Sequence, residues 1–473
     1  MRVKLVGHNV DLDVLRNATD YSHCFTPEVL SAAYARISRS SDSLEVLRRK
    51  AAEDINAARK SNGKIVFDMG HASIAEHAVF NFDMEGVSRL AVEYIEHSRL
   101  ASYTEKSQRY VTFNPHKREY CIPTELSDTL YADNFERFLH DSYRQYHRIL
   151  EAIKKQQRLQ GGLPEEDARY VTPLATTTSL GMTINGRSLE MMIRRLLASP
   201  LHEVKLIGQT LYDEVKEVAP SLFRYETPEP LRQNMLRDIR SVLSLNVKKQ
   251  SNIPDTVDLL WSHEHKCGDA HILAMLVHQA SQASLPLCYT AVRELSETEQ
   301  RSLLGKLFAN MEAWTAVPRQ WELVPFTFEI VCSASCFAQL KRHRMATIIP
   351  QAYDPSLGCV VPESIKNDDS VLRNFHEIMD ASNELYYRLE HEFGADIAQY
   401  TLTQAHQRRI IVNMNARELY HFSRLRQDGH AQWEIRSIAN QMLIAAREVM
   451  PLTMALVCGK DVFEEVKSNY FNR

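Results

Sequence analysis

Arg342, His343 and Arg344 form a basic cluster that could bind an anion. Two guanidiniums and an imidazole can bind a phosphate group or an electron-rich ring. Consecutive residues of a helix point in different directions, so the three side chains converge on one ligand only if the helix ends there. Pro350 follows closely and predicts that ending. The alternative is a solvated basic helix end that offsets the helix dipole.

A second cluster combines a hydroxyl group with a guanidinium. Ser107 and Arg109 lie two residues apart, so in an extended loop both side chains face one side and could share an anionic oxygen. A polar surface loop is the competing interpretation. Ser107 is not predicted to be a nucleophile, because no G-x-S-x-G elbow surrounds it.

The segment from Asn415 to Arg426 is predicted to form a helix, with Asn415 as its N-cap and Glu418 completing a capping box. Helical spacing gives a buried stripe of Leu419, Phe422 and Leu425, and a polar stripe of Arg417, His421 and Arg424. Capping does not explain so many basic residues, and we expect this stripe to contact a ligand.

Cysteine chemistry is not predicted. The chain has eight cysteines and no C-x-x-C pair, which favours reduced thiols over disulfides. Cys332 and Cys336 are spaced one helical turn apart and are expected to be core thiols. A short run from His263 to Cys267 lacks the further ligands of a tetrahedral centre, so no metal site is expected.

Two similar sets of elements must position these residues. A strand pattern of alternating apolar residues occurs around Phe82 and again around Phe328. A helix is expected after each: one set is Val87, Leu90, Ala91, Tyr94 and Ile95, and the other is Cys332, Cys336 and Leu340. Long amphipathic stretches near 203–218 and 431–449 close the two halves, and the first residues of the chain read as a short strand.

The halves also match in sequence. Glu76–Phe82 is similar to Glu322–Phe328 at an offset of 246 residues, and Asn185–Leu189 is similar to Asn415–Leu419 at an offset of 230. We therefore predict a first repeat at 1–225, a connector at 226–255 and a second repeat at 256–473. Prolines at both ends suit the connector.

Composition excludes several classes of function. The 473 residues include 56 basic and 60 acidic side chains, a net charge of −4, so no chain-wide positive field is available for nucleic acid. No G-x-G pair occurs, which excludes the Rossmann and Walker A glycine patterns. No apolar run is long enough to span a bilayer and no signal peptide is recognisable, so we expect a cytoplasmic protein without a membrane partner.

Several long segments resemble the flavin-dependent thymidylate synthase family. They are Gly70–Arg89, Ser107–Val111 and Asn415–Arg436. The family signature is Arg-His-Arg, then seven residues, then Ser. The resemblance covers nearly the whole chain twice, so it implies an α+β fold of two tandem domains that form a pseudo-dimer.

Neither copy of the signature is complete. The first copy has Glu96-His97-Ser98-Arg99 in place of Arg-His-Arg and one extra residue before Ser107, and the second has Ala352 and Asp354 in place of Ser and Arg. In the family, dUMP lies between two subunits. The resemblance implies one complementary set of dUMP ligands: Gln339, Arg342 and Arg426 from the second repeat, with Glu105, Ser107, Arg109 and Arg169 from the first. The opposite combination has Leu196 and Gln399 at the two arginine positions.

The resemblance also implies a flavin site. Its residues are His71, Ser73 and Glu76 of the first copy, with Arg342, His343, Arg344, Asn415, Arg417, His421 and His430 of the second. In the second copy, Val317 and Arg319 replace the flavin-binding His and Ser or Thr, so half the usual number of flavin sites is expected.

The activity that the resemblance implies is the reductive methylation of dUMP to dTMP with FAD, NADPH and methylenetetrahydrofolate. Arg426 would be the catalytic residue, since it could stabilise negative charge on the ionised pyrimidine. A homodimer would reproduce the family's four domains. Two alternatives remain: a diverged protein that binds dUMP or flavin without turnover, and a pyrimidine nucleotide hydroxymethyltransferase.

Overall fold

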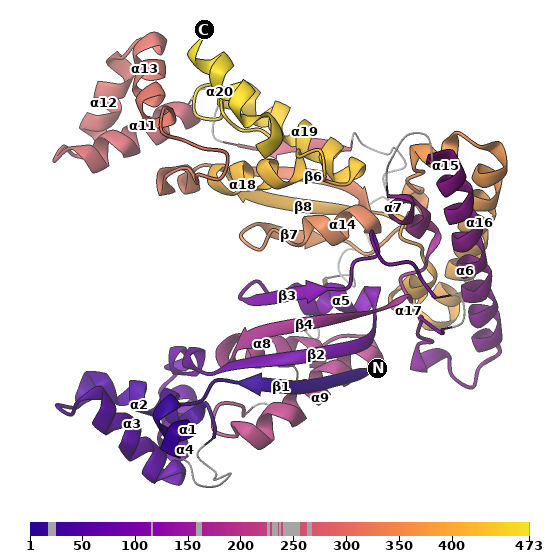
Figure 1. The fold of residues 1–473 in the computed structure, drawn as a ribbon, viewed down its shortest axis with the longest axis horizontal. Helices are drawn as coiled ribbons and strands as arrows, with labels where there is room; N and C mark the ends of the chain where they lie inside the picture. The colour runs from indigo at the N-terminus through magenta and orange to yellow at the C-terminus, as the bar shows by residue number, and fades with distance from the viewer. Residues whose placement is uncertain are drawn as a thin grey trace. The chain divides into compact units, whose positions relative to one another are not determined.

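The computed structural model describes residues 1–17, 25–114, 117–157, 163–224, 228, 235, 238–239, 256–262 and 267–472. The chain divides into two compact units (Figure 1). Unit 1 contains Met1–Lys249 and Pro362–Gln404, and unit 2 contains Gln250–Val361 and Ala405–Arg473. Each unit combines helices with an antiparallel sheet, which confirms the predicted α+β class.

The sheet of unit 1 has the strand order β1-β2-β4-β3. Phe80, Phe82 and Met84 are buried on one face of the central strand β2, as the alternating pattern predicts. The strands are β1 Arg2–His8, β2 Val79–Ser88, β3 Ala101–Glu105 and β4 Thr177–Asn185.

The sheet of unit 2 repeats this order as β5-β6-β8-β7. Phe326, Phe328 and Ile330 of β6 are buried against the helices that follow β8. The strands are β5 Val257–Trp261, β6 Pro325–Ser333, β7 Thr347–Pro350 and β8 Gln407–Asn415. The same topology in both halves confirms two tandem domains.

Each unit contains its own set of helices, and unit 1 also includes α15, α16 and α17 from the second half of the sequence. Those of unit 1 are α1 Leu12–Asn17, α2 Glu28–Arg36, α3 Leu44–Glu53, α4 Ile55–Gly63, α5 Arg89–Glu96, α6 Leu130–Gln157, α7 Pro164–Ala168, α8 Gly186–Leu197, α9 His202–Val218, α15 Glu363–Lys366, α16 Asp369–Phe393 and α17 Ala395–Ala398. Those of unit 2 are α11 Cys267–Ala280, α12 Leu285–Glu294, α13 Glu297–Phe308, α14 Ala334–Leu340, α18 Ala416–Arg426, α19 Trp433–Val449 and α20 Phe463–Phe471.

Equivalent side chains form equivalent hydrogen bonds in the two halves. Ser88 caps α5 and donates through Oγ to Glu203 of α9 at 2.7 Å, while Ser333 caps α14 and donates to Glu434 of α19 at 2.6 Å. In each half, this bond holds the turn between the strand and the following helix against a long helix, which is α9 in the first half and α19 in the second. The structural repetition therefore extends to individual polar contacts.

The extra residue of the first repeat lies in a β-bulge. The pairing of β2 with β4 shifts between Glu85 and Val87, and Gly86 between them has a φ of +68°, whereas β6 pairs with β8 without a shift. A positive φ favours glycine, which has no Cβ to clash. The bulge accommodates the insertion and leaves Ser88 equivalent to Ser333.

A helical layer in unit 1 combines segments from both repeats. Helices α6 and α16 lie side by side (Figure 1). Nearby, Pro173 forms a bridge with Thr403, to which it is equivalent at the 230-residue offset, and Leu174 N donates to Leu402 O at 2.8 Å. Equivalent residues that meet in this way form a local self-complementary contact. Because residues 362–404 of the second predicted repeat belong to unit 1, the bounds of the compact units differ from those of the sequence repeats.

Several local predictions are wrong. Val87 belongs to β2 and Cys332 to β6 rather than to helices, although Cys332 and Cys336 are buried as expected. Leu425 is 41% exposed because it lies on the pocket side of α18 rather than in the core. Pro350 ends a strand and not a helix, since α14 has already ended at Leu340.

Two predictions remain untested. The connector at 226–255 and the run from His263 to Cys267 lie largely outside the described residues. The repeat boundaries therefore remain a prediction. Over the part of the chain that the structure describes, no helix is long and apolar enough to cross a bilayer.

Candidate functional site

The Arg-His-Arg cluster lies in the turn between α14 and β7 of unit 2. Helix α14 ends at Leu340, so helical geometry no longer sets the directions of Arg342, His343 and Arg344. The side chain of His343 is buried, Arg342 is partly buried and Arg344 is exposed. The expected end of the helix at this cluster is confirmed, but only His343 points into the interior.

Arg426, at the end of α18, contacts this turn directly. Its Nε donates to Nε2 of His343 at 2.9 Å, and its Nη2 donates to the backbone oxygen of Gln339 at 3.1 Å. Three residues that the sequence assigns to substrate or flavin thus form one hydrogen-bonded cluster inside unit 2. The cluster fixes the direction of the Arg426 guanidinium.

Burial and charge keep the imidazole of His343 neutral. Burial lowers its pKa well below the ordinary histidine value, and the positive charge of Arg426 acts in the same direction. Neutral imidazole has one nitrogen that accepts a hydrogen bond, and Nε2 is that acceptor here. Its other nitrogen, Nδ1, lies 3.5 Å from Oε1 of Glu418.

Glu418 has a different role from the one predicted. Asn415 is the N-cap of α18, and its side chain accepts from the backbone N of Glu418 at 2.8 Å, as expected. The Glu418 carboxylate, however, faces His343 rather than closing a capping box. Burial raises its pKa above the ordinary glutamate value.

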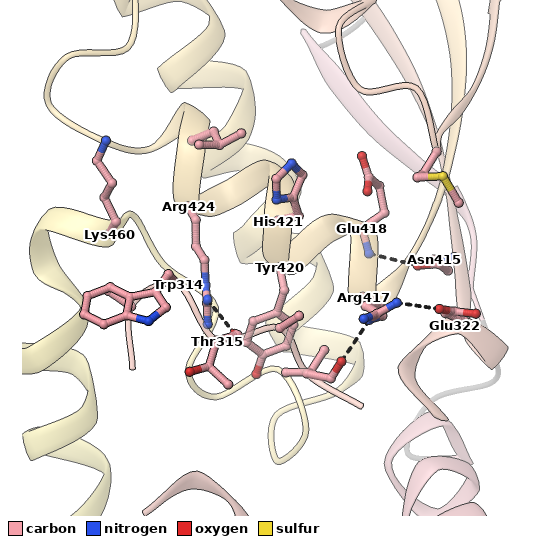
Figure 2. A pocket seen from close by; sticks show the side chains of 15 residues that line it. Trp314, Thr315, Glu322, Asn415, Arg417, Glu418, Tyr420, His421, Arg424 and Lys460 are labelled. Atoms are coloured by element: carbon pink, nitrogen blue, oxygen red, sulfur yellow. Dashed lines mark hydrogen bonds and ion pairs between the residues drawn. The ribbon is translucent and has the colours of Figure 1, made fainter. Parts of the chain in front are cut away.

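A pocket of about 660 Å³ lies beside α18 and is formed within unit 2 (Figure 2). Asn415, Arg417 and His421, three of the predicted flavin residues, line it. Trp314, which is 78% exposed, and Lys460 line the opposite end. The pocket therefore presents cationic groups, an imidazole and an exposed aromatic ring.

The basic residues of the pocket differ in their availability. Arg417 pairs with Glu322 at 2.7 Å and donates to the backbone oxygen of Val317 at 2.9 Å. Arg424 is buried and donates to the backbone oxygen of Thr315 at 2.6 Å (Figure 2), and burial lowers its pKa. Arg424 therefore braces the pocket wall, and the polar stripe is only partly available to a ligand.

The remaining predicted flavin residues are exposed. His71, Ser73 and Glu76 lie on the surface of unit 1, where Glu76 pairs with Arg187 at 2.6 Å. This pair is equivalent to Glu322 with Arg417 in unit 2. The side chain of His430 is exposed and its Nδ1 lies 3.0 Å from Asp428.

A second cluster of predicted residues lies in unit 1. Ser107 and Arg109 are in a turn, not an extended loop, because the backbone N of Arg109 donates to Oγ of Ser107 at 3.2 Å. Arg109 pairs with Glu166, and the Nε of Arg169 donates to the backbone oxygen of the same Glu166 at 3.2 Å. The two predicted phosphate-binding arginines thus both contact Glu166, Arg109 through the carboxylate and Arg169 through the backbone oxygen.

Arg89, for which no role was predicted, also belongs to this cluster. Arg89 forms a buried ion pair with Glu105. Burial opposes its charge, but the carboxylates of Glu105 and Glu96 raise its pKa. The sequence shows that Arg89 follows the alternating strand pattern directly, but it does not show that the fold brings Arg89 to Glu105.

Arg169 has a buried donor group that the cluster does not satisfy. Arg169 is 4% exposed, and its Nη2 is buried without a hydrogen-bond partner in the described part of the chain. Burial lowers the pKa of Arg169, and the charges of Arg89 and Arg109 act in the same direction. An anionic ligand would accept a hydrogen bond from this Nη2.

A residue from the second half supports this loop within unit 1. Gln404 Nε2 donates to Gln108 Oε1 at 2.8 Å and to Thr172 Oγ1 at 2.6 Å. These bonds are buried, so they hold the turn that carries Ser107 and Arg109 against the segment that follows Arg169.

The thiols do not resemble nucleophiles. Burial raises the pKa of Cys121, Cys336 and Cys458, so these side chains remain protonated at neutral pH. Within the described ranges, no group of three or more potential ligand side chains could hold a metal ion.

Comparison with known proteins identifies a matching family. The sequence profile described as thymidylate synthase complementing protein matches residues 21–221 and 270–452. The two matched regions correspond to the two structural repeats and together span most of the chain.

Some relatives match nearly the whole chain, and others match about half of it. UPF0159 protein Ta1429 of Thermoplasma acidophilum is 24% identical over 471 residues, and the match covers 90% of this chain and 94% of that protein. A flavin-dependent thymidylate synthase of Geobacter sulfurreducens is 32% identical and covers 44% of this chain with 84% of its own length. A protein of the same name from Sulfolobus acidocaldarius is 28% identical and covers 50% of this chain with 80% of its length.

Proposed function

The chain belongs to the thymidylate synthase complementing protein family, and on that premise we propose that it converts dUMP to dTMP in a flavin-dependent reaction. The observation that carries the proposal is the hydrogen-bonded cluster of Arg426, His343 and the Gln339 backbone. It holds a permanently charged guanidinium in a fixed direction, as a group that stabilises developing negative charge must be held.

The pocket beside α18 supports a flavin cofactor. A flavin nucleotide combines a planar aromatic ring with phosphate, and the lining of Arg417, Lys460, His421 and Trp314 suits both parts. Asn415, which also lines the pocket, and His343 nearby would complete the contacts in this unit. Bound flavin would supply the reducing equivalents of the reaction.

The residues of this chain would bind and orient the substrate. We assign the dUMP phosphate to Ser107, Arg109 and Arg169, because both arginines contact Glu166 in unit 1 and Arg169 has a buried donor without a hydrogen-bond partner among the described residues. Arg426 would stabilise negative charge on the ionised pyrimidine, with Gln339 and Arg342 beside the nucleotide. Glu105 is paired with Arg89 and would orient the ligand through that pair.

The composite arrangement is part of the proposal. One live site per chain would combine these residues of the two repeats, and the opposite combination would be inactive. The sequence supports this asymmetry, since Leu196 occupies the position equivalent to Arg426 and is fully buried. NADPH as reductant and methylenetetrahydrofolate as carbon donor belong to the same proposal.

An anaerobic turnover assay tests the function. Purified protein with FAD, NADPH, methylenetetrahydrofolate and dUMP should form dTMP while the flavin absorbance cycles. Mass analysis of the product separates methylation from hydroxymethylation. Flavin and dUMP binding without any product would instead support the binding protein, and absence of both would contradict the proposal.

A further inference from the structure

His343 is held rigidly in the turn between α14 and β7. Its backbone N donates to Leu340 O at 3.1 Å, and its backbone O accepts from Ala346 N at 3.1 Å. Its ring packs edge-on against Phe422 with the ring centres 4.7 Å apart, and the residue is 3% exposed. An imidazole with both its backbone and its ring fixed can orient a neighbouring group.

The bond from Arg426 determines which ring nitrogen carries the proton. Arginine is only a donor, so Nε2 of His343 must offer a lone pair to Nε of Arg426. In the neutral ring the proton then resides on Nδ1. Nδ1 is buried and makes no hydrogen bond within the described part of the chain, and the carboxylate oxygen Oε1 of Glu418 lies 3.5 Å from it.

Glu418 is fixed by the start of its own helix. Its backbone N is bound to the Asn415 side chain, which sets the position of its Cα, and the residue is 8% exposed. The neighbouring cation Arg417 already pairs with Glu322. The carboxylate of Glu418 faces the imidazole of His343, and the charges of His421 and Arg417 also act on it.

We propose that Glu418 and His343 are positioning residues for Arg426, with the Glu418 carboxylate holding His343 in the Nδ1–H form so that Nε2 accepts from Arg426. The role rests on the function proposed for Arg426. Glu418 touches neither Arg426 nor the substrate in this scheme, and it acts on Arg426 only through the tautomer and orientation of the imidazole. Glu418 also lines the pocket beside α18, so kcat is compared at saturating flavin.

The first repeat supports the coupling between these residues. At the 230-residue offset, Ser188 is equivalent to Glu418 and Leu196 to Arg426. Helix α8 has the same Asn cap, with Asn185 accepting from the backbone N of Ser188 at 2.9 Å. The half that lacks the arginine also lacks the carboxylate, although both helices begin with the same asparagine cap.

Two variants with a matched control test the scheme. Glu418→Ala removes the acceptor, Glu418→Gln keeps an uncharged acceptor of similar size, and Ser188→Ala changes the equivalent position of the first repeat. The full-length protein is labelled with ¹⁵N-histidine, and the His343 signals are assigned by their loss in His343→Gln. The tautomer is read without substrate, and kcat and KM for dUMP are measured separately.

In the wild type, we expect His343 to carry its proton on Nδ1. Glu418→Ala should populate the Nε2–H tautomer and lower kcat about 10-fold to 10²-fold through misplacement of Arg426, with a much smaller change in KM. Glu418→Gln should restore most of both properties, and Ser188→Ala should resemble the wild type.

The pH profile provides a further readout. The groups that face this site are Glu418, His421, Arg417, Arg426 and Glu322. Protonation of Glu418 should lower wild-type kcat on the acid side, and Glu418→Gln should lack that contribution.

A wild-type His343 protonated on Nε2 would overturn the scheme, as would Glu418→Ala with an unchanged tautomer and unchanged kcat. Absence of dTMP from the wild type would contradict the proposed function, and the tautomer comparison would still decide the role of Glu418.

Discussion

At the scale of residues, Arg109 and Arg426 should act on different parts of one nucleotide. Arg109→Ala removes a phosphate partner and is expected to weaken dUMP binding by about 1.5–3 kcal/mol. Arg426→Ala removes a donor to charge that develops during the reaction, and it should lower turnover about 10²–10³-fold with flavin still bound. Equilibrium binding and single-turnover rates measure the two effects separately.

Positions of the opposite combination provide the control for this pair. Conservative changes at Leu196, and changes at Ala352 or Gln399, should leave dUMP turnover nearly intact. Loss of turnover in folded, flavin-bound Ala352→Asp or Gln399→Glu, together with an active Arg426→Ala, would show that the live site belongs to the other combination of repeats.

His343 should also make stability depend on pH. Its pKa is well below 6.5 in the folded chain, because of burial and then the charge of Arg426, and near 6.5 when unfolded. Below pH 6.5 the unfolded state binds the extra proton, so acidification destabilises the fold by up to about 1.4 kcal/mol per pH unit. Above pH 6.5 His343 is neutral in both states and this destabilisation is absent.

Urea unfolding of the wild type and of His343→Gln at several pH values isolates this effect from the other histidines. The difference between the two proteins in free energy of unfolding should shift in favour of the variant as the pH falls from 7 to 5. A constant difference across this range would mean that His343 titrates normally in the folded protein.

At the scale of elements, the caps of α8 and α18 provide a matched pair. The side chains of Asn185 and Asn415 each accept from a backbone N three residues later, at 2.9 and 2.8 Å. Asn185→Ala and Asn415→Ala should each cost about 1 kcal/mol of stability. Only Asn415→Ala should also weaken flavin binding, because only this cap lines the pocket.

Thermal unfolding and flavin titration of the two variants make the comparison. Equal losses of flavin affinity would mean that Asn415 acts through helix stability alone. An unchanged affinity in both variants would remove Asn415 from the proposed flavin site.

At the scale of the whole molecule, we expect a homodimer with one live site per chain. Light scattering should give about twice the 54.4 kDa of the chain. Titration should saturate at two dUMP and two flavin molecules per dimer. A fully active monomer would contradict the assembly, and about four bound flavins per dimer would contradict the half-site arrangement.

The class of fold, the tandem repetition and the buried central strands follow from the sequence alone. Alternation places Phe82 and Phe328 in buried strands, and the asparagine caps mark the starts of α8 and α18. These features depend on local periodicity and on side-chain bonds to nearby backbone, which a short segment contains in full. The family resemblance likewise depends on contiguous motifs.

The pairing of the charged residues, by contrast, depends on how the elements pack. Glu418 looked like part of a capping box but faces His343, and Arg89 reaches Glu105 across the fold. Leu425 fits a buried stripe by spacing but lines a pocket. Long side chains can choose among several partners, and burial makes the choice depend on which elements pack nearby. The choice of partner therefore depends on contacts between residues far apart in the sequence, and the spacing of residues along the chain does not predict these contacts.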